Sequence, residues 1–104
     1  MAGFNSEAEK AALSLAEAMD EKGFAALREA EEAATRFRIG KQRTRLQFQQ
    51  RGLTRADADI RWSGTSDAKK ALSDNGWYMQ QAIMYHSAAA AQYARALYLR
   101  NSET

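Results

Sequence analysis

The segment WYMQQAIMYHSAAAAQYARALYLR, from Trp77 to Arg100, limits the fold of this chain more than any other stretch. It is rich in alanine and contains no proline or glycine, so we predict one uninterrupted helix. Two neighbouring lines of mostly apolar residues follow this helix at steps of three and four: Tyr78, Ala82, Tyr85, Ala89, Gln92, Ala96 and Leu99, and then Met79, Ile83, His86, Ala90, Tyr93 and Leu97. Because each line needs its own packing partner, we expect this helix to be covered on more than one side and to be the most buried element.

The first fifty residues predict a second long helix. One narrow apolar stripe steps by three or four along it, as in the seam of a coiled coil: Ala16, Met19, Gly23, Leu27, Ala30, Ala34 and Phe37. Asn5-Ser6, with Glu9 three residues later, is typical of a helix start. Gly23 predicts a kink or a close helix crossing, and Gly40 predicts a break or a bend.

The basic segment 36–48 allows two interpretations. As strands, RFRI and RLQF alternate around a GKQ turn. As a helix, the segment continues the apolar stripe through Phe37, Lys41, Thr44 and Phe48. We favour the helix, because an isolated hairpin of this length and charge is marginally stable in water.

Clear break signals follow the basic segment. Gly52 is expected to stop a helix, and the Thr54-x-x-Asp57 pattern is expected to start the next one. This helix should be short and end near residues 61–62. Ser66-Asp67 then caps the helix DAKKALSD.

The chain has no proline and no valine, so helix is favoured over strand almost everywhere. Asn75-Gly76 either ends the helix that begins at Ser66 or bends it. The predicted fold class is all-α, as a helical hairpin or small bundle with a bent long N-terminal helix, one or two short helices and a long C-terminal helix. A chain of 104 residues forms one domain at most, so we assign residues 1–104 to a single helical domain.

Charge is separated along the sequence. Residues 1–32 carry eight acidic and three basic residues, residues 33–55 carry seven basic residues and no acidic one, and residues 56–104 carry five of each. The residues expected to orient or bind partners are the acidic Glu29, Glu31 and Glu32 and the basic Arg36, Arg38, Lys41, Arg43, Arg45 and Arg51. We favour acidic and basic faces that lie against each other, within one subunit or between neighbours, because complementary charge sets register and partner choice. The alternatives are a nucleic-acid-binding module that uses the basic segment 36–55, and a solvated face.

No residue pattern of this sequence indicates a catalytic, cofactor or metal site. There is no cysteine, and the single histidine, His86, lies within an apolar line, so we expect it to be packed or hydrogen-bonded. The serines lack a triad context, and the glycines are too far apart to form a phosphate-binding loop. We therefore predict that the protein is not an enzyme and uses no cofactor.

Aromatic residues, methionine and alanine crowd the C-terminal helix. Tyrosine, tryptophan and methionine are favoured in protein interfaces. The predicted interface consists of Trp77, Tyr78, Met79, Ile83, Tyr85, Ala89, Tyr93 and Leu97. The expected partners are further copies of this chain or other structural proteins, ahead of nucleic acid.

The N-terminal sequence MAGFNSEAEK has neither the basic start nor the apolar run of a signal peptide. No window approaches the roughly 18 apolar residues that a membrane span needs. We therefore expect synthesis in the cytoplasm and no membrane partner.

Two short stretches resemble known families. Trp62-Ser63-Gly64, between helical stretches, is similar to the Trp-x-Gly helical-hairpin family of small type VII secretion proteins, although the acidic residue that this family has four positions after a tyrosine is Ser102 here, after Tyr98. The stretch GLTRAD at 52–57, together with DAKKALSDNGWYMQQAIMY at 67–85, resembles small helical structural proteins of tailed phages, particularly phages of actinobacteria.

The first resemblance implies a secreted hairpin that needs a second chain to complete its bundle. The second implies a virion or assembly component. We predict a non-enzymatic structural or assembly protein that acts by helix-mediated self-association or by docking on a larger complex, with a phage virion as its expected location.

Overall fold

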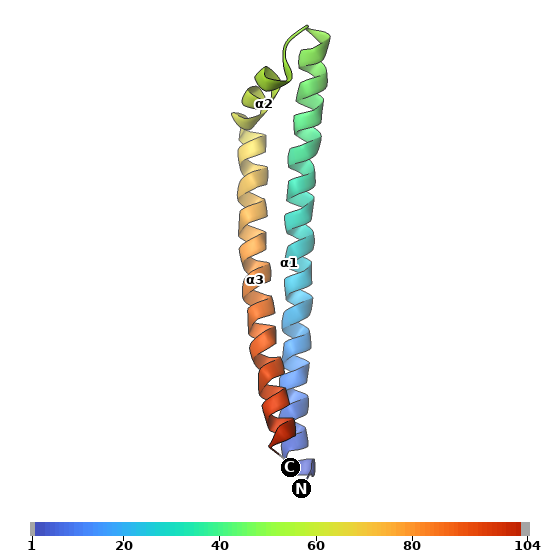
Figure 1. Cartoon of the computed structure of the whole chain (residues 1–104), viewed down its shortest axis with the longest axis vertical. Coiled ribbons are helices and arrows are strands. Elements are labelled where there is room, and N and C mark those ends of the chain that lie inside the picture. The colour runs from blue at the N-terminus through green and yellow to red at the C-terminus, as the bar shows by residue number, and fades with distance from the viewer. Residues whose placement is uncertain (1, 103–104) are drawn as a thin grey trace. The chain divides into compact units, whose positions relative to one another are not determined.

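A computed structural model of the chain describes residues 2–102, with the side chains of residues 7–102. This part of the chain consists of three helices in the order α1 (Ala2–Gln50), α2 (Arg55–Ser63) and α3 (Ser66–Asn101) (Figure 1). The all-α prediction, with two long helices and one short helix, is confirmed. Segment 36–48 lies inside α1, so the helical interpretation is right and the hairpin of strands is wrong. None of these helices combines the length and the apolar character that a membrane span requires.

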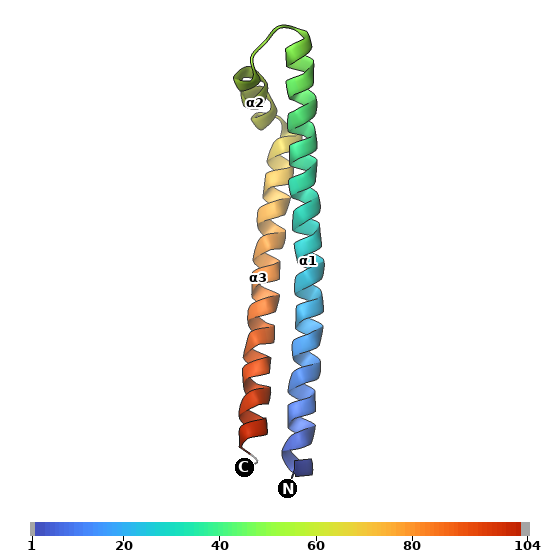
Figure 2. The same cartoon turned by 45° about the vertical axis from the view of Figure 1, so that its right-hand side comes forward.

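The contacts of the chain group into two compact units, which are described separately. The first unit combines Met1–Leu27 with Gln80–Thr104, and the second is Arg28–Met79. In the first unit, the beginning of α1 and the end of α3 lie side by side and run antiparallel, as Figures 1 and 2 both show. The second unit holds the rest of α1, all of α2 and the first part of α3. That the chain folds as a single domain stays a prediction.

The core of the first unit is a seam of small residues. The buried residues are Ala12, Ala16, Gly23 and Ala26 on α1, and Ala82, Ala89 and Ala96 on α3. Their steps of three, four and seven keep them on one side of each helix. Alanine and glycine let the two backbones approach closely, while the half-buried Tyr85, Gln92 and Leu99 fill the spaces between the alanines. The first line of the C-terminal helix is therefore its packing line.

Most of the second line of α3 is exposed within the first unit. Ile83, Ala90, Tyr93 and Leu97 are exposed, and only His86 is half-buried. The expectation that α3 is the most buried element is wrong, because this part of α3 packs against α1 alone and buries one side. A partner on the second line stays a prediction.

The second unit has one large buried side chain. Every buried hydrophobic residue in 28–79 is an alanine except Trp62 of α2, which is 8% exposed. The Trp62 ring packs against the backbone of Gly40, where an added Cβ would overlap the ring, and lies 5.7 Å from the Phe37 ring between centroids. Because α1 continues through Gly40, this glycine marks a close contact and not a break.

The end of α1 follows from its backbone chemistry. Gly52 has a φ of 76°, in the left-handed region that glycine adopts without steric cost. The N–H of Gly52 donates to the carbonyl of Gln49 at 3.0 Å, and the N–H of Leu53 donates to the carbonyl of Phe48 at 2.9 Å. This pair of bonds is a Schellman motif, and it satisfies carbonyls that the last helical turn leaves free. The predicted stop at Gly52 is confirmed.

Threonines cap the two following helices. The Thr54 hydroxyl accepts the N–H of Asp57 at 3.1 Å and donates to the Asp57 carboxylate at 2.8 Å, which confirms the predicted start of α2. At the start of α3, the hydroxyl of Thr65 accepts the N–H of Ala68 at 3.2 Å. The cap is therefore Thr65, one residue before the predicted Ser66, which is the first residue of α3.

Two predicted boundaries lie inside helices. α1 begins at Ala2, ahead of the predicted start at Asn5-Ser6, and the Ser6 side chain lies outside the described residues. α3 continues through Asn75-Gly76, where the side-chain amide of Asn75 donates to the carbonyl of Ala30 at 2.9 Å. Asn75 thus ties α3 to α1 in the second unit and does not end a helix.

Candidate interaction surfaces

The end of α3 presents an uncharged face opposite its packing line. The large apolar members of this face are Ile83, Met84, Leu97 and Tyr98, which are 62%, 64%, 56% and 71% exposed. Smaller exposed residues lie between them: Ser87, Ala90, Ala91 and Ala94. These eight residues are named the outer α3 face. From Gln80 to Ala94 the sequence has no Asp, Glu, Lys or Arg.

The exposed side of α1 in the same unit has a different character. It carries the charged residues Glu7, Lys10, Glu17 and Glu21 among the apolar Leu15 and Phe24. Charged residues of this kind are typical of a helix side that faces water. The contrast makes the outer α3 face the candidate interface of the first unit.

Polar contacts join the two helices beside this face. Nδ1 of His86 lies 2.8 Å from Oδ1 of Asp20, and the His86 ring packs edge-on against Phe24 with 4.7 Å between centroids. The expectation that His86 is packed or hydrogen-bonded is confirmed. Partial desolvation, followed by the hydrogen bond and the negative charge of Asp20 and then by the charge of Glu17, raises the pKa of Tyr93.

The predicted interface residues divide between two sides of α3. The exposed ones are Ile83, Tyr93 and Leu97 in the first unit and Trp77 and Met79 in the second. Those on the packing line are Tyr78, Tyr85 and Ala89, which are half-buried or buried. The Lys22 ammonium lies 5.8 Å from the centroid of the Tyr85 ring, so this ring contributes to contacts within the chain.

Met84, Ala91 and Tyr98 were not among the predicted residues. Their spacing of seven residues marks a third line beside Ile83, Ala90 and Leu97. That spacing could have identified them, since residues seven apart share one side of a helix.

Two of the predicted basic residues, Arg36 and Arg45, have partners on other helices of the second unit. Arg45 of α1 donates twice to the carboxylate of Asp59 of α2, at 2.8 Å from both Nε and Nη2. Asp74 of α3 accepts from Arg36 and from Lys70, each at 3.1 Å. Arg38 donates to the hydroxyl of Thr35, within α1, at 3.1 Å. Lys41 is half-buried, whereas Arg43 and Arg51 are exposed.

The acidic residues Glu29, Glu31 and Glu32 are exposed on α1. Within residues 7–102, no ion pair joins them to the basic segment. Contact of the acidic and basic faces within one chain stays a prediction, although Arg36 and Arg45 pair with carboxylates of α3 and α2. Contact between neighbouring chains stays a prediction.

The Arg45–Asp59 pair changes the titration of both groups. The hydrogen bond from Arg45 lowers the pKa of Asp59, partial desolvation opposes it, and the charges of Arg45, Lys41 and Arg55 lower it further. The hydrogen bond to Asp59 raises the pKa of Arg45, against a smaller opposing effect of desolvation. The pair stabilises the contact between α2 and α1 when both side chains are ionised.

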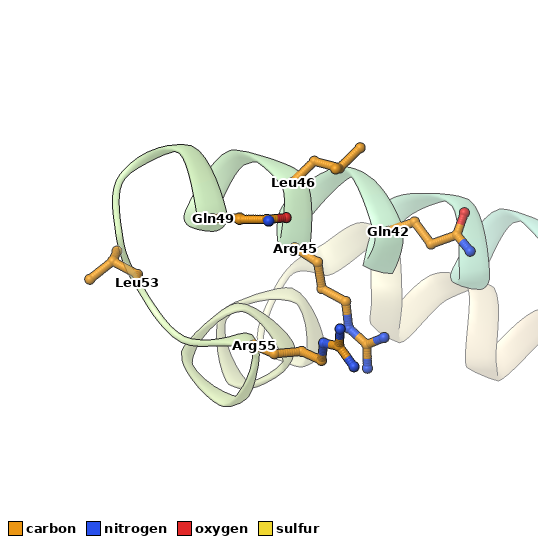
Figure 3. Close-up of a pocket in the computed structure, with 6 residues that line it drawn as sticks. All are labelled: Gln42, Arg45, Leu46, Gln49, Leu53 and Arg55. Atoms are coloured by element: carbon orange, nitrogen blue, oxygen red, sulfur yellow. The ribbon is translucent and has the colours of Figure 1, made fainter.

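Two open grooves lie beside these arginines in the second unit. One, of about 450 Å³, is lined by Gln42, Arg45, Leu46, Gln49, Leu53 and Arg55 (Figure 3). Figure 3 shows Arg45 and Leu46 of α1 pointing in different directions, with Arg55 at the start of α2. The other, of about 670 Å³, has Arg36, Arg43 and Lys70 along its walls with Asp67 and Trp62.

Comparison with protein-family models, with curated protein sequences and with solved structures found no match to this chain. The two family resemblances therefore stay predictions.

Proposed function

We propose that the protein is a non-enzymatic structural or assembly component, whose helices associate with further copies of the chain or dock on a larger complex. The observation that carries the proposal is the outer α3 face, whose large apolar residues are all more than half exposed. Monomeric soluble proteins rarely expose a contiguous apolar surface of this kind unless it binds something.

The total exposed surface supports association. The chain exposes 7590 Å². A folded monomer of its mass, 11.6 kDa, exposes about 5,800 Å² by the usual scaling of area with mass. The excess, about 1,800 Å², is larger than the roughly 800 Å² that each partner contributes to a typical stable interface.

Size-exclusion chromatography with light scattering tests the proposal. We expect a mass above the monomer value of 11.6 kDa that increases between low and high micromolar protein concentration. A constant monomer mass up to high micromolar concentration would overturn self-association.

For the biological setting, we propose a virion or assembly component of a tailed phage, on the sequence resemblance alone. Neighbouring genes for capsid, portal or tail proteins would support this setting. Genes for a type VII secretion apparatus would instead favour the secreted hairpin partner, since Trp62-Ser63-Gly64 lies at the junction of α2 and α3.

A nucleic-acid-binding module is the second candidate. The groove that holds Arg36, Arg43 and Lys70 places three cations beside a single carboxylate, that of Asp67, which could attract a phosphate backbone. Asp74 already pairs with Arg36 and Lys70, and so neutralises part of that charge. We therefore rank this candidate below protein assembly.

A further inference from the structure

We infer that the groove of about 670 Å³ in the second unit binds an acidic peptide segment of a partner protein. The segment lies in extended form along α1, with its carboxylates near the cations of the groove and its apolar side chains on the buried residues. This inference rests on the proposed docking to a larger complex, and it adds the site and the chemistry of the partner. It concerns residues 36–71, which all belong to the second unit.

The groove has a buried apolar floor and an exposed polar rim. Trp62 of α2 and Ala71 of α3, which are 8% and 4% exposed, form the floor. The rim consists of exposed residues of α1 and α3: Arg36, Arg43, Gln47, Asp67 and Lys70. A buried apolar centre inside a polar rim is typical of surfaces that bind proteins.

The length of the groove fits a short peptide. Its lining on α1 runs from Arg36 to Gln47, a distance of about 16 Å at the rise of an α-helix. An extended chain covers this distance with about five residues. Because alternate side chains of an extended chain point to opposite sides, one set can reach the floor while the other set lies nearer the rim.

The cations of the rim are only partly neutralised. Arg36 and Lys70 share the carboxylate of Asp74, each at 3.1 Å, so two cations meet one anion there. Among residues 7–102, Arg43 takes part in no ion pair. A guanidinium group binds a carboxylate through paired N–H donors. Arg43 is therefore the cation that is available to a carboxylate of the partner.

The floor of the groove carries an unused donor. Among the described residues, the indole N–H of Trp62 is the one buried side-chain group that lacks a hydrogen-bond partner. A peptide carbonyl beside Trp62 would accept this N–H and remove the cost of leaving it unpaired. Because the N–H is buried, a lining side chain must move aside first, and side-chain changes of this size are common on binding.

The same lining disfavours a nucleic acid in this groove. A phosphate backbone binds through cations, and the carboxylates of Asp67 and Asp74 would repel it. A peptide has backbone N–H groups that the carboxylate of Asp67 can accept. A peptide also brings apolar side chains to Ile39 and Trp62, for which a phosphate backbone has no use.

Fluorescence anisotropy with a labelled peptide tests the inference. The probe is a capped hexapeptide in which glutamate alternates with leucine, and two comparison peptides carry glutamine or lysine in place of every glutamate. The full chain is titrated with its natural sequence and as Arg43→Gln and Trp62→Phe. The matched controls are Arg51→Gln, an exposed arginine outside the groove, and Ile83→Gln on the outer α3 face. Circular dichroism checks the helix content of each variant.

We expect saturable binding of the glutamate peptide to the natural chain. Binding should weaken about 3- to 5-fold in Arg43→Gln, which removes an exposed charge pair, and about 5-fold in Trp62→Phe, which removes the indole donor. The glutamine peptide should bind more weakly and the lysine peptide should not saturate. Arg51→Gln and Ile83→Gln should stay within about 2-fold of the natural chain.

Three results would overturn the inference. The first is equal binding of the three peptides, and the second is natural affinity in Arg43→Gln or in folded Trp62→Phe. The third is tighter binding of a short single-stranded DNA that Arg43→Gln abolishes, which would assign the groove to nucleic acid. If Trp62→Phe loses helix content, Arg43→Gln decides alone.

Light scattering on the same samples separates this inference from the proposed function. Absence of peptide binding together with a mass above that of the monomer would overturn the inference and leave self-association intact. Absence of peptide binding together with a constant monomer mass would overturn both.

Discussion

The imidazole of His86 lies directly against the backbone of Gly23. A Cβ added at Gly23 would lie 2.7 Å from both Cε1 and Nε2 of the ring. The ring cannot easily move away, because Nδ1 is hydrogen-bonded to Asp20 and one edge contacts Phe24. Gly23 therefore allows the close crossing of α1 and α3 that the sequence predicted as one of two options, and α1 passes through it without interruption.

This contact predicts that Gly23→Ala destabilises the protein. Alanine favours a helix over glycine by about 1 kcal/mol, but overpacking in a close contact costs about 1–3 kcal/mol. We expect a net loss of up to about 2 kcal/mol in the free energy of unfolding, measured by urea denaturation and circular dichroism.

Gly76→Ala is the matched control. Gly76 is an exposed glycine of α3, and a Cβ added there would meet nothing within 4 Å. Alanine at this position should stabilise the protein by about 0.5–1 kcal/mol. Equal effects of the two substitutions would contradict the close crossing at Gly23.

Trp62→Ala should weaken the packing of α2 against α1 in the second unit. Trp62 is the large buried side chain of that unit, and its removal leaves a cavity against Gly40 and Phe37. We expect a loss of about 3–5 kcal/mol in the free energy of unfolding, measured by denaturation with urea. Ile60→Ala, on the same helix and 74% exposed, should change the stability by less than about 0.5 kcal/mol.

Trp62→Phe gives a finer test of the same contact. The indole N–H of Trp62 is buried without a hydrogen-bond partner among the described residues. An unpaired buried donor costs about 1–3 kcal/mol, so a phenyl ring should retain most of the packing and remove this cost. A loss with Phe as large as that with Ala would contradict this account.

The Arg45–Asp59 pair predicts a loss of stability in acid. The pKa of Asp59 is lower in the folded protein than in the unfolded chain, so its contribution is present above the ordinary value of about 3.9. That contribution is lost as the pH falls through the lowered pKa. In urea titrations from about pH 6 to about pH 2, the stability advantage of the natural chain over Asp59→Asn should shrink below about pH 4.

Ile83→Gln and Leu97→Gln should each weaken self-association. Both residues belong to the outer α3 face, and glutamine keeps good helix propensity. We expect a rise in the dimer dissociation constant of about 5- to 30-fold each, equivalent to about 1–2 kcal/mol, measured by sedimentation equilibrium. Leu15→Gln, on α1 of the same unit and 43% exposed, should change the constant by less than about 2-fold. An equal effect at Leu15 would place the interface elsewhere.

Binding to duplex DNA or RNA should be weak. A module that neutralises several phosphates loses affinity steeply with salt, with a log–log slope of about −0.9 for each phosphate contacted on B-DNA. Because Asp59 and Asp74 already pair with Arg45 and Arg36, we expect fluorescence anisotropy to show no saturable binding near physiological salt. Saturable binding with a steep slope, abolished by Arg43→Glu, would favour the nucleic-acid-binding module.

The features that local chemistry controls could be predicted from the sequence. Gly52 and Thr54 end and start helices through bonds to residues within five positions of them. The packing line from Tyr78 to Leu99 follows from its spacing. The stripe on α1 was less certain, because steps of three and of four are equally helical. Leu27 and Ala34 were predicted on this stripe, whereas the buried residues are their neighbours Ala26 and Ala33.

The features that depend on distant residues could not be predicted in the same way. Nothing near Arg45 in the sequence identifies Asp59 as its partner, and nothing near Gly40 shows that Trp62 packs on it. The exposure of Ile83 and Leu97 also escaped prediction, because a hydrophobicity pattern does not show how many helices are present to cover it. For the same reason, the hydrophobicity pattern does not show whether the partner that covers these residues is a second copy of the chain or another protein.

The alanine seam has a consequence for the amount of active protein in a cell. A pair of helices held together mainly by methyl groups gains little free energy on its own, so its melting temperature should rise with the quantity of protein made. The rate of synthesis would then determine how much protein survives. Chains at low concentration would be monomers that proteases can cleave, and chains at high concentration would be protected by association.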